Sequence, residues 1–132
     1  MKAYLKTQPK TSKDIKCQND CMIRSVAIAT NTEYSKVHEI MYRYGWRASR
    51  GNSKGKWEDQ ITNTLADLGF RYEKISYPAI KGQSRMTAKS MTNEGTFILR
   101  MAGHVAAYKE GVLMDTYDCS YKCVYFSWKI FK

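Results

Sequence analysis

Apolar residues recur at intervals of three and four positions in three stretches of the first half of the chain. This interval is that of α-helices which bury one face and expose the other, so three helices are expected. The first would begin at Cys21, behind the N-cap Asp20. The second would end at Gly45, and the third would run from near Trp57 to Gly69. The recurring apolar positions are Ile23, Val26 and Ala27, then Val37, Ile40, Met41 and Tyr44, then Ile61, Leu65 and Leu68.

From residue 70 onward the pattern changes to short runs of alternating or continuous apolar residues, which are typical of strands. These runs are Phe70–Ile75, Thr96–Met101, His104–Tyr108, Val112–Thr116 and Val124–Trp128. A hairpin turn is expected at residues 109–111, an edge strand at residues 3–5 and a short helix at residues 85–92. Helices followed by an antiparallel sheet predict an α+β fold.

The chain has 132 residues, which suits one domain. We expect a basic N-terminal extension over residues 1–16 and a single domain over residues 17–132. The extension carries five lysines and no apolar core of a secretory signal, and no run is long enough to span a membrane. These features predict a cytoplasmic protein without membrane contacts, whose four cysteines are reduced.

Lysine and arginine number 22 against 12 acidic residues, a net charge of +10. Such a charge favours encounters with acidic proteins or nucleic acid. Because no base-reading motif is present, any affinity for nucleic acid should be non-specific and salt-dependent. The plainer interpretation is that the aromatic residues complete the core and the cations are solvated. The residues that could contact a polyanion or partner are Arg43, Trp46, Arg47, Arg50, Lys54 and Lys56.

The strongest chemical signal is a cysteine at the start of a helix, where unpaired N–H groups and the helix dipole favour a thiolate. The predicted hairpin brings His104 and Asp115 to neighbouring strand ends. Cys21 could then act as nucleophile, His104 as base and leaving-group acid, and Asp115 as the group that orients the imidazole. Asp118 is the fallback carboxylate, and each of these residues alone is more often structural.

Two blocks carry a family resemblance: Asn19–Thr30, with the sequence NDCMIRSVAIAT, and Gly95–Val105 with Gly111–Thr116. They resemble small papain-like proteins common in bacteriophages and, more distantly, the cysteine peptidases that process bacteriocin leaders. The resemblance implies a papain-like fold with Cys21, His104 and Asp115 as a triad. It also implies a thiol hydrolase or transferase acting on a peptide, amide or isopeptide bond of a peptide or protein substrate, in the host cytoplasm.

Papain-like enzymes place an oxyanion-hole glutamine several residues before the cysteine, whereas here only Gln18 and Asn19 stand close to it. These two are the candidate oxyanion donors. A member with a poor oxyanion hole would be an inactive binding module for an acidic host protein or nucleic acid, which is the alternative function.

The four cysteines form two pairs, Cys17 with Cys21 and Cys119 with Cys123, at a spacing that structural zinc sites also use. A four-thiolate zinc site is therefore a rival interpretation. We favour no metal and no cofactor, with Cys17, Cys119 and Cys123 as incidental thiols.

Overall fold

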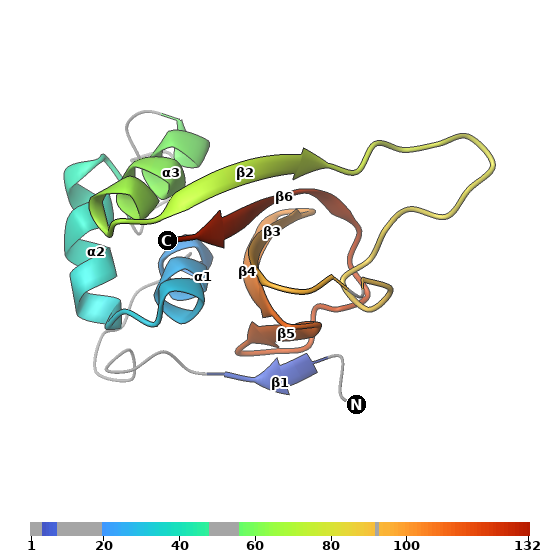
Figure 1. The fold of residues 1–132 in the computed structure, drawn as a ribbon, viewed down its shortest axis with the longest axis horizontal. Helices are drawn as coiled ribbons and strands as arrows, with labels where there is room; N and C mark the ends of the chain where they lie inside the picture. Colours follow the sequence, from blue (N-terminus) through green and yellow to red (C-terminus); the bar gives the residue numbers. More distant parts are fainter. Residues whose placement is uncertain (1–3, 8–19, 48–55, 92) are drawn as a thin grey trace.

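The structure is a computed structural model that describes residues 4–7, 20–47, 56–91 and 93–132. Within these ranges the chain is an α+β fold with three helices and one six-stranded sheet (Figure 1). The helices gather at one side of the sheet, and the long connection between β2 and β3 extends on the opposite side (Figure 1). The elements are β1 (Tyr4–Lys6), α1 (Cys21–Thr30), α2 (Tyr34–Arg43), α3 (Trp57–Asp67), β2 (Arg71–Ser76), β3 (Thr96–Met101), β4 (His104–Lys109), β5 (Val112–Asp115) and β6 (Val124–Phe131).

The strand order in the sheet is β1-β5-β4-β3-β6-β2. All neighbours are antiparallel except β1 and β5, which pair in parallel, so the sheet is mixed and the expectation of a purely antiparallel sheet is wrong in this respect. The edge strand expected at residues 3–5 is found as β1. Its register pairs Lys6 with Asp115, the last residue of β5.

The tight turn after β4 fixes the register of the strands that matter most. Glu110 and Gly111 both have positive φ, 48° and 83°, as a two-residue hairpin of the right-handed strand twist requires. Lys109 therefore pairs with Val112, and the pairing continues inward to Ala107 opposite Met114. The predicted turn is confirmed.

Alternating residues of the sheet fill two separate cores. On one face Ile98, Val105 and Ala107 pack with the buried residues of α1, α2 and α3. On the other face Leu99 and Ala106 pack with the loops that precede β3 and β6. Because α1 lies mainly against β4, the start of this helix and the start of that strand are held in one place.

The helix expected at residues 85–92 is wrong, whereas α1 begins at Cys21 behind the N-cap Asp20 as expected. No helix forms over residues 85–91, because Thr87 bridges to Cys123 and the amide of Val124 donates to the carbonyl of Met86. Asp20 occupies the N-cap position of α1, yet its side chain caps no helix amide. Its carboxylate instead accepts hydrogen bonds from Arg24 and Tyr34.

Candidate functional site

The centre of the site is a hydrogen bond between the imidazole of His104 and the carboxylate of Asp115. The bond joins Nε2 to Oδ2, and both side chains are almost completely buried. The hairpin register places Asp115 opposite Ala106, two residues along β4 from His104. Residues two apart on a strand share a face, so the carboxylate reaches the ring diagonally rather than from directly across.

Cys21 approaches the same imidazole from the helix side of the sheet. It is the first residue of α1, and its thiol interacts with the ring of His104 and with the backbone of Val105. His104 thus lies between a carboxylate and a thiol.

The charges of Cys21 and His104 support each other. Burial opposes ionisation of the thiol, but the hydrogen bond and charge of His104, the Val105 backbone and the charge of Arg24 outweigh it and lower the pKa of Cys21. Burial likewise opposes the imidazolium, but hydrogen bonds with Asp115, Cys119 and Cys21 raise the pKa of His104 to about 11. Both directions favour a thiolate beside an imidazolium at neutral pH.

Asp115 is held in its ionised form by several donors. Burial raises the pKa of this carboxyl, yet the bonds from His104 and from the Thr116 amide, together with nearby cationic charge, lower it overall. The Thr116 amide lies 2.7 Å from Oδ1, and Arg24 Nη2 lies 3.5 Å from the same oxygen. The two oxygens of Asp115 therefore have separate partners, which fixes the plane of the carboxylate.

Arg24 connects this carboxylate to the first turn of α1. Its Nη1 forms an ion pair with Asp20, four residues earlier. The other oxygen of Asp20 accepts a 2.7 Å hydrogen bond from the hydroxyl of Tyr34, the first residue of α2. This chain of contacts was not predicted from the sequence, although the spacing of Asp20 and Arg24 is that of a helical ion pair.

Cys119 is a second thiol at the site, and the sequence interpretation missed it by treating it as incidental. It is fully buried, and its Sγ lies 3.4 Å from Asp115 Oδ2. Donor atoms of His104, Asp115 and Cys119 lie within 4.8 Å of one another, a set that could also ligate a metal ion. The only signal in the sequence is its position four residues after Asp115, just beyond the end of β5.

The thiol of Cys21 opens into a cleft of about 250 Å³. Its walls come from the first turn of α1, the start of α3, the end of β3 and the turn into β4. The residues that line it are Cys21, Met22, Trp57, Arg100, Gly103, His104 and Val105. The side chains of Cys21 and His104 therefore border the same open space.

The other residues that the sequence predicted to be functional are not among the described residues that line the cleft at Cys21. Gln18, Asn19, Cys17, Arg50 and Lys54 lie outside the described residues. The polyanion set was proposed as a contact surface, with core aromatic residues and solvated cations as the plainer interpretation. Lys56 and Arg43 are exposed and Trp46 is buried in the core, which agrees with the plainer interpretation for these three residues. Asp118 bonds to Ser120 and not to His104.

Arg47 belongs to the same predicted set and is held against the end of α2. Its guanidinium stacks on the ring of Tyr42 at 3.8 Å and donates to the carbonyls of Tyr42 and Trp46. An arginine whose donors are turned inward in this way presents less of its fork to a phosphate. Among the described members of the predicted polyanion set, Trp46 and Arg47 are therefore turned toward the protein, whereas Arg43 and Lys56 are exposed.

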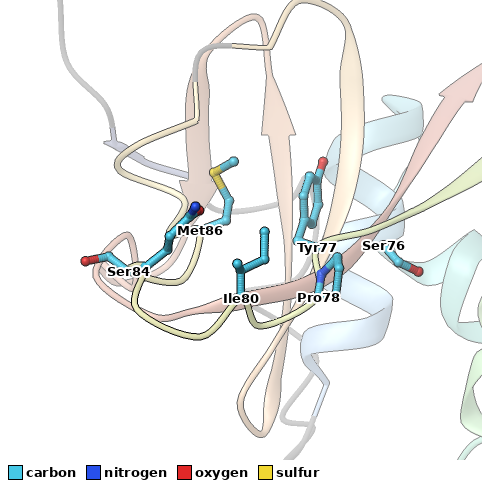
Figure 2. Close-up of a pocket in the computed structure, with 7 residues that line it drawn as sticks. Ser76, Tyr77, Pro78, Ile80, Ser84 and Met86 are labelled. Carbon is cyan, nitrogen blue, oxygen red and sulfur yellow. The ribbon is translucent and has the colours of Figure 1, made fainter.

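A second hollow of about 250 Å³ lies under the connection between β2 and β3, remote in sequence from the triad. Figure 2 shows Tyr77, Ile80 and Met86 extending in the same direction from this connection, while the hydroxyl of Ser84 points away from them. Its lining residues include no acid, no lysine or arginine, no histidine and no cysteine, so it offers shape but few groups for catalysis.

Among the described residues, no helix combines the length and the apolar character needed to cross a bilayer.

Comparison of the chain with protein-family models, with curated proteins and with solved structures finds no match in any of the three.

Proposed function

We propose that this protein is a papain-like thiol hydrolase or transferase that acts on a peptide, amide or isopeptide bond. Cys21 is the nucleophile, His104 the general acid and base, and Asp115 the residue that orients the imidazole. One observation carries the proposal: His104 lies between the carboxylate of β5 and a thiol at the N-terminus of α1, at the base of an open cleft.

The chemistry follows from the positions of the three groups. The Cys21 thiolate attacks the substrate carbonyl carbon, and the electron pair of the C=O bond moves to oxygen. Collapse of this tetrahedral species breaks the bond to nitrogen, and the imidazolium of His104 gives its proton to the departing amine. An acyl thioester on Cys21 remains.

The second half of the reaction regenerates the thiolate. Neutral His104 takes a proton from water, or from an acceptor amine, as that nucleophile attacks the thioester. The tetrahedral species then expels the Cys21 sulfur, which yields a carboxylic acid with water or a new amide with an amine. Amides at the start of α1 are suited to hold the oxyanion, with Asn19 or Gln18 as the proposed side-chain donor.

The papain-like assignment rests on the order and setting of these residues. A thiol at a helix N-terminus comes first in the chain, and the histidine and carboxylate follow on consecutive strands of the sheet against which that helix packs. With the resemblance of the two sequence blocks, this order supports a phage-encoded enzyme that works on a peptide or protein in the host cytoplasm.

Alkylation of Cys21 by iodoacetamide, followed residue by residue by mass spectrometry, tests the proposal. At pH 6 an ordinary thiol of pKa near 8.5 is only about 0.3% ionised, so His104→Ala should slow alkylation of Cys21 by roughly 100-fold. His38→Ala is the matched control, because His38 is the chain's other histidine, stacks on Tyr34 and Tyr42 and does not line the cleft. It should leave the rate unchanged.

Circular dichroism of each variant separates loss of the ion pair from loss of the fold. If folded His104→Ala reacts at Cys21 as fast as the parent protein, the catalytic proposal is wrong. The binding module for an acidic protein or nucleic acid would then take its place.

A further inference from the structure

One wall of the cleft carries a cation that the triad chemistry does not use. Arg100, on β3, lines the same cleft as Cys21 and His104. Its register partner on β4 is Val105, which places the two residues side by side on the helix-facing side of the sheet. The guanidinium is therefore near the nucleophile but separate from the hydrogen bonds of the triad.

Arg100 is held in position by an aromatic surface. Its guanidinium carbon lies 4.7 Å from the centre of the Trp57 ring, at the start of α3. Trp57 is itself fixed by Phe126 and Trp128, whose ring centres lie 6.3 and 6.0 Å from its own. A stacked arginine keeps its planar edge free for hydrogen bonds while its face is occupied.

Within the described part of the chain, this guanidinium has no carboxylate partner. The acid nearest to Trp57 in the sequence, Glu58, forms its ion pair with Lys74, at 3.2 Å. None of the residues lining the cleft is acidic. A half-buried cation beside a nucleophile, without an internal counter-ion, is suited to bind an anionic group of the substrate.

We propose that Arg100 is a specificity residue which binds a carboxylate of the substrate next to the bond that Cys21 attacks. The proposal rests on the function proposed above and adds a substrate class to it. The carboxylate belongs either to an acidic side chain or to a free C-terminus, since both present the same planar pair of oxygens. Met22, Trp57 and Val105 supply apolar walls that suit the methylene groups of a glutamate.

Two electrophiles of nearly the same size, one anionic and one neutral, test this directly. Iodoacetate and iodoacetamide both alkylate a thiolate with loss of iodide, but only the first carries a carboxylate. The measured quantity is the ratio of their rate constants at Cys21. Replacing the cation by Arg100→Gln should lower this ratio by about threefold to tenfold, as expected for one partly exposed charge pair.

Arg71→Gln is the matched control for net charge. Arg71 is also stacked on an aromatic ring, that of Phe131 at 4.9 Å, but it lies on the edge strand β2 and does not line the cleft. It should leave the ratio unchanged. The difference between the two variants should shrink as salt rises from 0.05 to about 0.5 M, because salt screens exposed charge.

Short peptides distinguish the two sources of carboxylate by protecting Cys21 from iodoacetamide. Acetyl-Ala-Glu-Ala-amide carries only a side-chain carboxylate, acetyl-Ala-Gln-Ala only a terminal one, and acetyl-Ala-Gln-Ala-amide neither. Protection by the first identifies an acidic side chain, and protection by the second identifies a C-terminus. Equal protection by all three overturns the proposal.

The outcomes also separate this proposal from the proposed function. If His104→Ala slows alkylation but Arg100→Gln leaves the ratio unchanged, or Arg71→Gln lowers it equally, the enzyme stands and the carboxylate specificity is wrong. If His104→Ala has no effect, the function itself is wrong.

Discussion

Two thiols approach His104 from different parts of the molecule, and their surroundings drive their acidities in opposite directions. Cys21 lies at the N-terminus of α1, and its pKa is lowered. Cys119 lies in the loop between β5 and β6, and its pKa is raised, first by burial and then also by the charge of Asp115. A neighbouring imidazole is therefore not enough to activate a cysteine.

The difference lies in what else each sulfur meets. Cys21 faces the cleft and has helix amides and Arg24 close by, all of which favour negative charge. Cys119 is completely buried and lies 3.4 Å from a carboxylate oxygen, which disfavours a second negative charge. The same histidine thus has one thiol suited to react and one suited to remain protonated.

The pH dependence of alkylation should show this contrast most strongly. Because a lowered pKa keeps the thiolate to lower pH, Cys21 should alkylate well below pH 8.5, whereas Cys119 should react only at alkaline pH. At pH 6.5 we expect rates at least about 100-fold apart. Mass spectrometry of protein alkylated at graded pH measures both rates in one sample. If Cys21 and Cys119 show the same dependence of alkylation rate on pH, the proposed difference between their pKa values is wrong.

Asp115→Asn should bring the pH profiles for alkylation of Cys21 and Cys119 closer together, because it changes the pKa of both thiols. Loss of the carboxylate lowers the pKa of His104 and so raises that of Cys21, which should slow its alkylation at pH 6.5 by about tenfold, the effect of one pKa unit. The same change removes a negative charge from Cys119 and should shift its profile to lower pH. Asp118→Asn is the control, because Asp118 bonds to Ser120 instead, and it should change neither profile.

Arg24→Met should have a smaller effect on Cys21 and a clear effect on stability. Its removal takes a positive charge from Oδ1 of Asp115, which keeps its bond from the Thr116 amide, and a decrease in the alkylation rate of about threefold is expected. Of the partners that the described residues give the Asp20 carboxylate, it leaves the Tyr34 hydroxyl alone, which should lower the free energy of unfolding by about 2 kcal/mol. Arg24→Lys should restore part of the alkylation rate and part of the stability, the latter measured by urea unfolding. If Arg24→Met leaves the urea midpoint unchanged, the contacts of Arg24 with Asp20 and Asp115 do not stabilise the fold.

Cys119→Ala should have the smallest effect on the reactive thiol. Since Cys119 contributes a protonated side chain, Cys21 should alkylate within about twofold of the parent rate. The small cavity should lower the free energy of unfolding by about 1 kcal/mol. A large loss of Cys21 reactivity in this folded variant would show that the two thiols act together.

Much of this arrangement was predictable because it depends on periodic burial and one turn. The apolar spacing located α1, α2 and α3, and the hairpin at Glu110 and Gly111 was enough to bring His104 and Asp115 together. That these residues catalyse a reaction stays a prediction. The helix expected at residues 85–92 was wrong because main-chain bonds to the segment before β6 replaced helical bonds there.

The contacts that tune the site were not predictable in the same way. Cys119 reaches it from a loop, where no repeating pattern specifies direction. The alternation of β3 gives the face of the sheet on which Arg100 lies, but not its contact with Trp57 or its place in the cleft. The role of Arg24 at the site was not predicted, because its spacing from Asp20 indicates a helical ion pair but gives no sign of its second contact, with Asp115. Such side chains are placed by the tertiary fold alone.

The parallel pairing of β1 with β5 has a practical consequence for anyone who handles the protein. The amide of Thr7 and the hydroxyl of Tyr4 both donate to the main-chain carbonyl of Asp115, at 2.7 and 3.2 Å. Trimming the chain past these residues would release the backbone that carries the carboxylate while leaving every residue of the triad in place. A shortened protein could thus look intact by sequence and be a poor reagent, so affinity tags and truncations belong elsewhere.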